Sequence, residues 1–405
     1  MQKFINFKQY LKCFFIAIFA YNIAKISIKN SYASLAYQHL ESANYYLLMD
    51  ADNYEILKSR NINEKIAPSS MTKLMTAYVV FDQVKKGNVK LQNRCLIGKD
   101  AWRKSGSSMF LNYGDVVSID ELVRGLLAVS ANDAAIALAQ TTANSYEHFI
   151  GLMNSKAKEL KMYNSHFMNP HGLHQEGHYM TLRDLATLIM KLYQDFPEYA
   201  QYLSIPEFTY RNITQKNRNP LIKNNYDGIL GGKTGHTNQG GYGLVAIVKR
   251  ENRRLVAVVN KAPSPKIREN IITDLLDYGF NNFKKVYIYE KGDEVANLNV
   301  WLGNKKQIKT IVKEDISFNI PRDIEVENIK VELKYLNPLN APIKKDEVVG
   351  TLQINIEGYE SKNFDIYAKE NIDKVGFIRK IKRILEFKIN KYFPNLIHKL
   401  TKTNF

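Results

Sequence analysis

The spacing of apolar residues divides the first two thirds of the chain into strands at both ends and helices between them. Two short β-prone runs, 45–50 and 55–60, flank Ala51-Asp52-Asn53-Tyr54 and predict a hairpin. Apolar residues at helical spacing predict helices at about 67–86, 119–127, 133–142 continuing through 160, and 181–193. A glycine-rich stretch, 228–243, then leads into two more predicted strands, 244–249 and 255–261. This order suits an antiparallel sheet with helices packed around it, an α+β domain, and does not suit a β-α-β repeat.

The pattern changes beyond residue 284, where short alternating runs are separated by turn residues. They predict strands at 286–289, 295–300, 308–312, 329–335 and 348–354. We interpret this region as a small, separate β-sandwich. The predicted domains are therefore an α+β domain at 34–283 and a β-rich domain at 284–370.

The last segment, 371–405, contains a basic amphipathic pattern. Apolar residues recur at helical spacing from 375 to 393, with six Lys and Arg residues between them. Because the apolar length is interrupted, such a helix lies on a membrane surface and does not cross it. A surface helix packed on its own domain is the alternative.

The first 33 residues resemble a secretory signal peptide. Three lysines precede a short apolar stretch, 14–20, and Ser31-Tyr32-Ala33 offers a small-residue cleavage pattern. Cleavage after Ala36 and an uncleaved N-terminal anchor are the alternatives. In each case we expect an exported protein, at the periplasmic face of the inner membrane and peripheral to it.

The net charge of the chain and the distribution of its basic residues indicate which kind of partner it binds. The chain has 405 residues, 45% of them hydrophobic, and a net charge of +17. Its Lys and Arg residues are spread along the chain, and no nucleic-acid motif accompanies them. We therefore expect no nucleic acid, and an anionic membrane surface or wall polymer as the partner.

Candidate chemistry resides in three short signatures, which follow one another as Ser70-Met71-Thr72-Lys73, Ser130-Ala131-Asn132 and Lys233-Thr234-Gly235. Ser70 and Lys73 are three residues apart at the start of a predicted helix, so their side chains can touch. A neutral Lys73 amine can take the proton of the Ser70 hydroxyl. That neutrality requires burial and a nearby cation, for which Lys233 is the candidate.

The other two signatures supply the remaining groups of an acyl-transfer site. Ser130 can pass a proton to a leaving amine, and Asn132 can hold a substrate carbonyl. Lys233 and Thr234 suit a terminal carboxylate, Gly235 lets a ligand approach the backbone, and the His236 N–H can serve as an oxyanion donor beside that of Ser70. Each signature has a plain structural alternative, such as a helix cap, but their ordered combination favours a serine acyl-transfer enzyme.

A histidine cluster raises a competing hypothesis of a metal site. His166, His171, His174 and His178 lie close in sequence, but their spacing is not H-E-x-x-H, and Pro170, Gly172 and Gly177 argue against a helix that presents two imidazoles together. We therefore expect neither a metal nor another cofactor.

These signatures resemble those of the low-molecular-mass penicillin-binding D-alanyl-D-alanine carboxypeptidases. The resemblance spans essentially the whole predicted mature chain and continues into the second domain at Val300-Trp301-Leu302-Gly303. It is carried by 66–76, Gly106-Ser107-Ser108-Met109-Phe110-Leu111, Ser130-Ala131-Asn132-Asp133-Ala134, Asn169-Pro170-His171-Gly172-Leu173 and Lys233-Thr234-Gly235-His236-Thr237. Ala131 departs from the glycine commoner in the family.

The resemblance implies a β-lactamase/transpeptidase-like first domain and removal of the terminal D-Ala from peptidoglycan pentapeptides through an acyl-enzyme on Ser70. It implies Lys73 as base, Ser130 as proton shuttle, Asn132 as substrate ligand, and Lys233 with Thr234 as carboxylate ligands. β-Lactams are then expected as covalent inhibitors. A β-lactamase, a D,D-endopeptidase and a catalytically silent wall-binding protein remain the alternatives.

Overall fold

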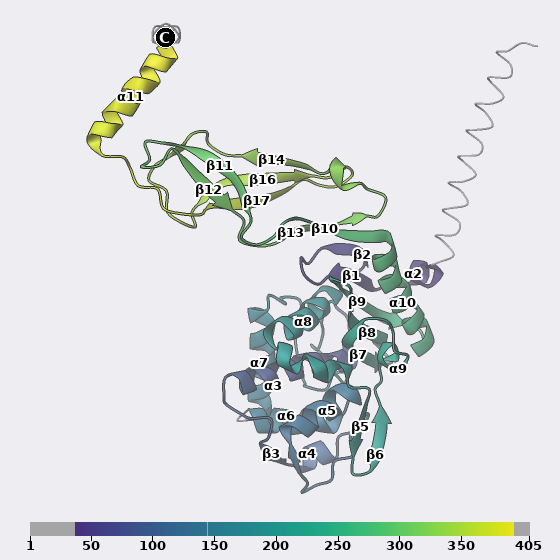
Figure 1. Ribbon diagram of the computed structural model, residues 1–405. Helices are drawn as coiled ribbons and strands as arrows, with labels where there is room; N and C mark the ends of the chain where they lie inside the picture. Colours follow the sequence, from purple (N-terminus) through teal and green to yellow (C-terminus); the bar gives the residue numbers. More distant parts are fainter. Residues whose placement is uncertain (1–36, 144, 393–405) are drawn as a thin grey trace, which may run out of the picture. The chain divides into compact units, whose positions relative to one another are not determined.

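The computed structural model describes residues 37–143 and 145–392, and it divides into two compact units between Phe283 and Lys284 (Figure 1). The predicted signal peptide, 1–33, and the end of the predicted tail, 393–405, lie outside the described residues. Each unit is described by itself.

The first unit is built on an antiparallel sheet of five strands. Its order is β2-β1-β9-β8-β7, so β7 lies at one edge. The strands are β1 (Tyr46–Asp50), β2 (Ile56–Arg60), β7 (Ile229–Thr237), β8 (Gly241–Arg250) and β9 (Arg253–Ala262). All four pairings are antiparallel. The predicted α+β architecture is confirmed, because the strands at both ends of this region form one sheet.

The helices of the first unit come from the middle of its sequence and from its two ends (Figure 1). The helical elements are α2 (Gln38–Ser42), η1 (Ser69–Thr72), α3 (Lys73–Lys85), α4 (Lys99–Trp102), α5 (Ile119–Ala128), α6 (Asn132–Thr142), α7 (Tyr146–Glu159), α8 (Leu182–Asp195), η2 (Pro197–Ser204), α9 (Pro220–Lys223) and α10 (Pro265–Asn282). Two small hairpins complete the unit, β3 (Arg94–Leu96) with β4 (Val116–Ser118) and β5 (Glu207–Tyr210) with β6 (Ile213–Lys216).

Two features of the helices differ from the sequence-based prediction. The continuous helix expected to reach residue 160 is two helices, because Ala143 is extended and the Ser145 side chain caps α7 by accepting from the His148 N–H. Helix α10 was not expected. Ser264 caps it and Pro265 opens it, so its start carried a recognisable signal that periodicity alone did not use.

Both faces of the central strands are buried, which explains their nearly continuous apolar sequence. On one face Val245, Ile247 and Val256 join the larger core formed with the central helices. On the other face Leu244 and Ala257 pack in a second core with residues of α2 and α10. Because successive side chains of a strand point to opposite faces, they enter these two cores in turn. The central strands are therefore held firmly on both faces, and they support the edge strand β7.

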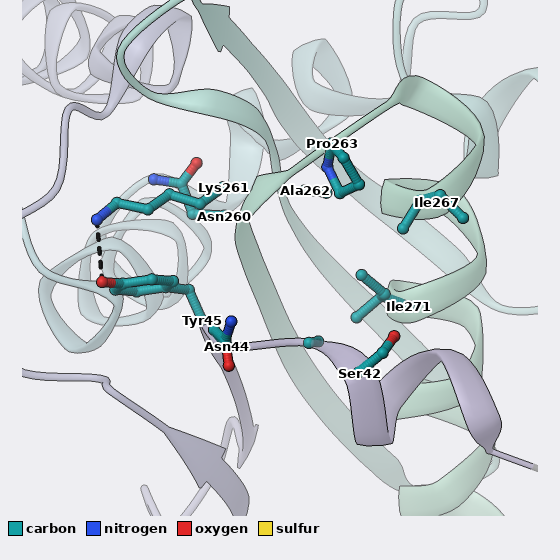
Figure 2. A pocket seen from close by; sticks show the side chains of 10 residues that line it. Ser42, Asn44, Tyr45, Asn260, Lys261, Ala262, Pro263, Ile267 and Ile271 are labelled. Carbon is teal, nitrogen blue, oxygen red and sulfur yellow. Dashed lines mark hydrogen bonds between the residues drawn. The ribbon is translucent and has the colours of Figure 1, made fainter.

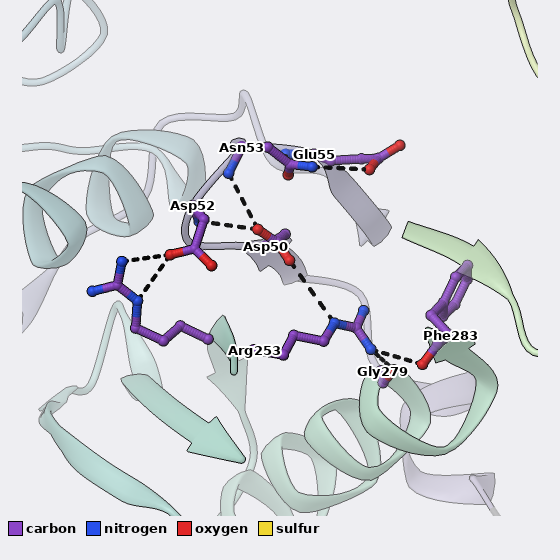
Figure 3. A network of polar contacts seen from close by, with 8 residues as sticks. Asp50, Asp52, Asn53, Glu55, Arg253, Gly279 and Phe283 are labelled. Atoms are coloured by element: carbon purple, nitrogen blue, oxygen red, sulfur yellow. Dashed lines mark hydrogen bonds and ion pairs between the residues drawn. The ribbon is translucent and has the colours of Figure 1, made fainter. Parts of the chain in front are cut away.

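A buried polar network joins the β1–β2 turn to the end of α10 (Figure 3). The Asp50 carboxylate accepts from the backbone N–H groups of Asp52 and Asn53, at 3.0 and 3.2 Å, and lies 3.8 Å from the Arg253 Nε. Arg253 Nη1 donates to the carbonyl oxygens of Gly279 and Phe283, at 2.9 and 2.8 Å. The guanidinium therefore satisfies carbonyls at a helix C-terminus that have no partner within the helix.

The second unit is rich in strands. Its six-stranded sheet has the order β14-β16-β17-β12-β11-β15, and β10 pairs with β13 separately. The elements are β10 (Phe283–Tyr289), β11 (Glu294–Trp301), β12 (Gln307–Ile311), β13 (Ile316–Pro321), η3 (Val326–Asn328), β14 (Lys330–Lys334), β15 (Leu339–Asn340), β16 (Val348–Asn355) and β17 (Lys362–Ala368). Buried residues of β13 and of the sheet form one core, so this unit has a hydrophobic interior of its own.

Helix α11 (Phe377–Tyr392) follows the second unit's strands and exposes apolar side chains. Ile378 is 83% exposed and Leu385 is 53% exposed. Arg383 donates to the Gly303 carbonyl at 2.6 Å, and the Phe387 ring lies 5.1 Å from that of Trp301. Among the helices that the structure describes, none has the length and apolar character needed to span a membrane.

Candidate active site

Ser70 lies in a tight turn that leads into the buried helix α3. The turn, η1, has 3-10 geometry, and Ser69 has a φ of +52°, a left-handed conformation that few non-glycine residues adopt. Two glycines make room for it. A Cβ on Gly172 would lie 1.8 Å from the Ser69 carbonyl oxygen, and one on Gly235 would lie 2.8 Å from that of Pro68. The loop at 172 and strand β7 therefore press directly against the turn that carries Ser70.

Lys73 is fully buried and its amine touches Ser70. The Nζ donates to Ser70 Oγ at 2.9 Å, to Asn132 Oδ1 at 2.8 Å and to the His171 carbonyl at 2.6 Å. Three oxygen atoms therefore surround the amine, and one of them, the Ser70 hydroxyl, can itself donate to the amine when the amine is neutral. The predicted contact between Ser70 and Lys73 is present, and helix spacing brings it about.

The surroundings of Lys73 favour its neutral form. Burial lowers its pKa well below the ordinary range, and the nearby Lys233 cation lowers it further. The Asp133 carboxylate opposes these effects, and Lys104 adds to them. An amine with a lowered pKa can accept a proton near neutral pH.

Ser130 and Asn132 face the same cluster from the start of α6. Ser130 has a φ of +65°, and its Oγ accepts a hydrogen bond from Lys233 Nζ at 2.9 Å. The Asn132 amide donates to the Ser105 carbonyl at 2.8 Å while its oxygen accepts from Lys73. The loop therefore turns both side chains inward, as the sequence predicted from their alternation.

Asp133 fastens a second loop to α6. Its carboxylate accepts from Ser108 Oγ at 2.6 Å and from the backbone N–H groups of Met109 and Leu111, at 3.1 and 3.2 Å. The Asn132 N–H donates to the Ser107 carbonyl at 2.7 Å. The segment 105–111 is thereby held over the Asn132 side of the cluster.

Strand β7 brings Lys233-Thr234-Gly235 to the edge of the sheet, beside the turn that carries Ser70. Lys233 and Thr234 are buried, and Lys233 also donates to the Thr234 carbonyl at 3.3 Å. Gly235 allows the close approach to Pro68 and Ser69 described above. His236 is exposed and stacks on Tyr242, with ring centroids 4.0 Å apart.

Lys233 has further cationic neighbours that the sequence analysis did not identify. Burial lowers its pKa to about 7, with Arg218 and Arg268 acting in the same direction. Arg268 lies on α10, is 7% exposed, and has no hydrogen-bond partner among the described residues for its buried Nε. Positive charge thus accumulates beside Thr234, which is what a bound carboxylate requires. Because α10 was not predicted from the sequence, Arg268 was not identified as a candidate residue.

His178 supports the turn that carries Ser70. His178 Nε2 lies 2.8 Å from Thr72 Oγ1, and its Nδ1 accepts from the Met168 N–H. Burial lowers the pKa of His178 to about 4 and that of His171 to about 3, with Lys104 and Lys73 contributing at His171. Within the described residues, no three or more His, Cys, Asp or Glu side chains are grouped so that they could hold a metal.

Comparison with protein families yields two matches that together cover most of the chain. Residues 33–264 match the family described as D-alanyl-D-alanine carboxypeptidase, and residues 283–374 match the C-terminal domain of penicillin-binding protein 5. Among curated proteins, the chain is 37% identical to D-alanyl-D-alanine carboxypeptidase DacC of Escherichia coli, over 87% of this chain and 89% of that one. It is 35% identical to DacF of Bacillus subtilis, over 84% and 88%.

Solved structures agree with this relationship. Penicillin-binding protein 5 of Haemophilus influenzae is similar with a TM-score of 0.78 and 33% identity, over 82% of this chain and 98% of that one. The carboxypeptidase DacD of Francisella tularensis is similar with a TM-score of 0.69 and 28% identity, over 82% and 94%. Both similarities extend over the two units.

Proposed function

The chain belongs to the D-alanyl-D-alanine carboxypeptidase family, and from this premise we propose that it removes the terminal D-Ala from the pentapeptide stems of peptidoglycan through an acyl-enzyme on Ser70. The observation that carries the proposal is the 2.9 Å contact between Ser70 Oγ and the buried amine of Lys73. The chain is a serine-type hydrolase, and the assignment of roles to its residues is part of the proposal.

Acylation begins when the neutral Lys73 amine takes the Ser70 proton and Ser70 Oγ attacks the carbonyl carbon of the penultimate D-Ala. The backbone N–H groups of Ser70 and His236 stabilise the resulting oxyanion. The C–N bond then breaks, and Ser130 delivers the proton that the leaving amine needs. Water subsequently hydrolyses the ester, which releases the shortened stem and restores Ser70.

Substrate binding relies on the cations around β7. Lys233, Thr234 and Arg268 receive the free carboxylate of the terminal D-Ala, and Gly235 lets the stem lie against the strand. Asn132 holds the stem through its amide. Arg268 supports this assignment because its guanidinium is buried, acts electrostatically on Lys233, and lacks a carboxylate of the protein as an ion-pair partner within the described residues.

The same chemistry explains acylation by penicillins, in which the β-lactam amide takes the position of the stem. A β-lactamase would hydrolyse that acyl-enzyme rapidly, whereas a carboxypeptidase stays labelled. The second unit and the family matches support the carboxypeptidase over a β-lactamase. A D,D-endopeptidase would instead cut isolated cross-linked muropeptides.

We further propose that the protein acts outside the cytoplasmic membrane, after removal of a signal peptide, and docks by α11. The exposed apolar residues of α11 and its many basic residues support this, because the former enter the lipid interface and the latter attract anionic headgroups. Deletion of 377–405 should transfer the protein from the membrane to the soluble fraction. This deletion spares Ile372 and Val375, which are buried in the second unit. Unchanged membrane association would contradict the docking.

Replacement of the nucleophile tests the function. Ser70→Ala should abolish both labelling by fluorescent penicillin and release of D-Ala from a diacyl-D-Ala-D-Ala peptide, with nearly unchanged thermal stability. Ser69→Ala is the matched control, since it removes the neighbouring hydroxyl and should leave the label in place. Label retained by Ser70→Ala would overturn the assignment.

A further inference from the structure

A cavity of about 500 Å³ opens at the end of β9, outside the groups assigned to the reaction (Figure 2). Its apolar side consists of Ala262, Pro263 and two isoleucines of α10, Ile267 and Ile271. A volume of this size is typical of sites for small molecules, and an apolar wall of this kind accepts a methyl group or the face of a ring.

The other side of the same cavity is polar and carries no carboxylate. It is lined by Ser42, Asn44, Tyr45, Asn260 and Lys261, and the Asn260 amide itself donates to the Ala67 carbonyl at 3.5 Å. In Figure 2 Asn44 and Tyr45 lie away from Ile267 and Ile271, the Lys261 amine reaches the Tyr45 hydroxyl, and Ser42 lies beside Ile271. The cavity therefore combines amide donors and acceptors with an apolar wall and one positive charge, and it favours a neutral or anionic polar ligand over a cation.

Lys261 is held at this position by the backbone. Its φ is +53°, and the register of β8 with β9 shifts between Tyr242 and Leu244, where a Cβ on Gly241 would meet the Lys261 Cα at 2.8 Å. The amine lies 3.0 Å from the Tyr45 hydroxyl, which in turn donates to Glu64. Left-handed backbone at a non-glycine residue is costly and is often found where it directs a side chain to a ligand.

A second cavity, of about 430 Å³, joins the first to the predicted active site. It shares Lys261, Ala262 and Pro263 with the first cavity and reaches His236 and Thr237 at the end of β7. Its remaining wall includes the amides of Asn238 and Gln239 and again no carboxylate. The two cavities therefore share Lys261, Ala262 and Pro263, and their linings together run from β7 to α10.

The stem has the length needed to follow this surface. His236 pairs with Tyr242, and Tyr242 pairs with Ala262, so two strand spacings, or roughly 10 Å, separate β7 from Ala262. If the terminal carboxylate lies at Lys233 and the scissile carbonyl at His236, the rest of the stem leaves toward Thr237. Three extended residues span roughly 10 Å.

We propose that the cavity between β9 and α10 binds the N-acetylated sugar to which the peptide stem is attached, and that Lys261 attracts the negative charge of the stem on the way to it. An N-acetyl group presents a methyl beside an amide, and the cavity offers Ile267 and Ile271 for the methyl and Asn44 for the amide. This inference rests on the proposed function and extends its substrate from the peptide to the sugar-bearing stem.

Two variants and two substrates test the sugar site. Ser42→Trp fills the cavity from an exposed position, and Lys261→Asn removes the charge with a residue that tolerates positive φ. In the wild type, kcat/KM should be about tenfold higher for a disaccharide pentapeptide than for the sugar-free pentapeptide. Ser42→Trp should lose most of this advantage and retain kcat/KM for the sugar-free peptide within about twofold. Lys261→Asn removes a charge that the stem of both substrates meets, so it should lower kcat/KM for both substrates by a similar factor. Lys266→Ala, on the exposed side of α10, should retain the full advantage.

Binding measured without turnover separates this proposal from the proposed function. Calorimetry with the Ser70→Ala protein should show tighter binding of the disaccharide pentapeptide than of the sugar-free peptide, and Ser42→Trp in that background should remove the difference. Equal affinities, or a difference unchanged by Ser42→Trp, would overturn the sugar site. Absence of D-Ala release from both substrates, with the binding difference intact, would instead overturn the proposed function alone.

Discussion

Two clusters of buried charge in the first unit differ in how their charges are compensated. Lys73 and Lys233 are 0% and 2% exposed, and neither has a carboxylate within ion-pair distance among the described residues. Asp50 and Arg253 are similarly buried, at 0% and 8%, but they face each other and hydrogen-bond to backbone groups. The first cluster contains excess positive charge, and the second contains a compensated pair.

This difference separates a site for chemistry from a structural contact. Burial of an amine without an anion lowers its pKa, and the resulting instability is relieved when a proton moves or a carboxylate binds. A buried pair of opposite charges has no such use for a ligand, and loss of either partner leaves an uncompensated charge. We therefore expect substitutions in the first cluster to affect catalysis and those in the second to affect stability.

The largest effect should follow replacement of the base. Lys73→Met should lower kcat/KM for D-Ala release by about 10³-fold, because a positioned general base contributes roughly 10²–10⁴. Its free energy of unfolding should change by less than about 2 kcal/mol, since the lost hydrogen bonds are offset by removal of a buried amine. Steady-state kinetics and urea unfolding measure the two quantities. Activity within tenfold of the wild type would contradict a role for Lys73 as the base.

The structural pair should respond in the opposite way. Arg253→Met should lower the free energy of unfolding by about 3–5 kcal/mol, because Asp50 is left buried without its counter-charge, and should leave kcat/KM of the folded enzyme unchanged. Arg254→Met is the matched control. Arg254 pairs with Asp52 at 2.9 Å with its side chain 37% exposed, so the cost should stay below about 1 kcal/mol. Equal losses of unfolding free energy in the two variants would show that the buried Asp50–Arg253 pair stabilises the fold no more than the exposed pair does.

An intermediate effect is expected at Arg268. Arg268→Gln should lower kcat/KM by about 10–100-fold, mainly through KM, because a charged hydrogen bond to the substrate carboxylate is worth about 1.5–3 kcal/mol. Arg268→Lys should recover part of the loss. The same variant should be measured with a substrate whose terminal carboxylate is amidated, and there Arg268→Gln should have little effect. If Arg268→Gln weakens both substrates equally, Arg268 does not bind the carboxylate.

The smallest effect concerns pH. In the free enzyme kcat/KM should rise as Lys73 loses its proton and should fall as the pH passes through about 7, where Lys233, whose pKa is lowered, loses the charge that attracts the carboxylate. Lys233→Arg keeps a cation at all accessible pH values. Its descending limb should therefore move to higher pH by at least about one unit, as measured by pH–rate profiles. If the descending limb of kcat/KM does not move, it reports the titration of a group other than Lys233.

Local spacing was sufficient to predict some parts of the site. Ser70 and Lys73 touch because they are three residues apart at a helix start, and the hairpin near residue 50 formed where turn residues separate two β-prone runs. Helix α10 was missed because its apolar residues contact the sheet along a broad face, and only its Ser264-Pro265 start marked it clearly.

The amino-acid sequence by itself determined which groups are available, their order along the chain and the pairing of Ser70 with Lys73, because helix and strand periodicities act over a few residues. Only the tertiary structure decided that Ser130 meets Lys233 across 103 positions, that the His171 carbonyl accepts from Lys73, and that Arg268 joins the cations. The lowered pKa values of the two lysines belong to this second group, because desolvation arises only when distant segments exclude water together.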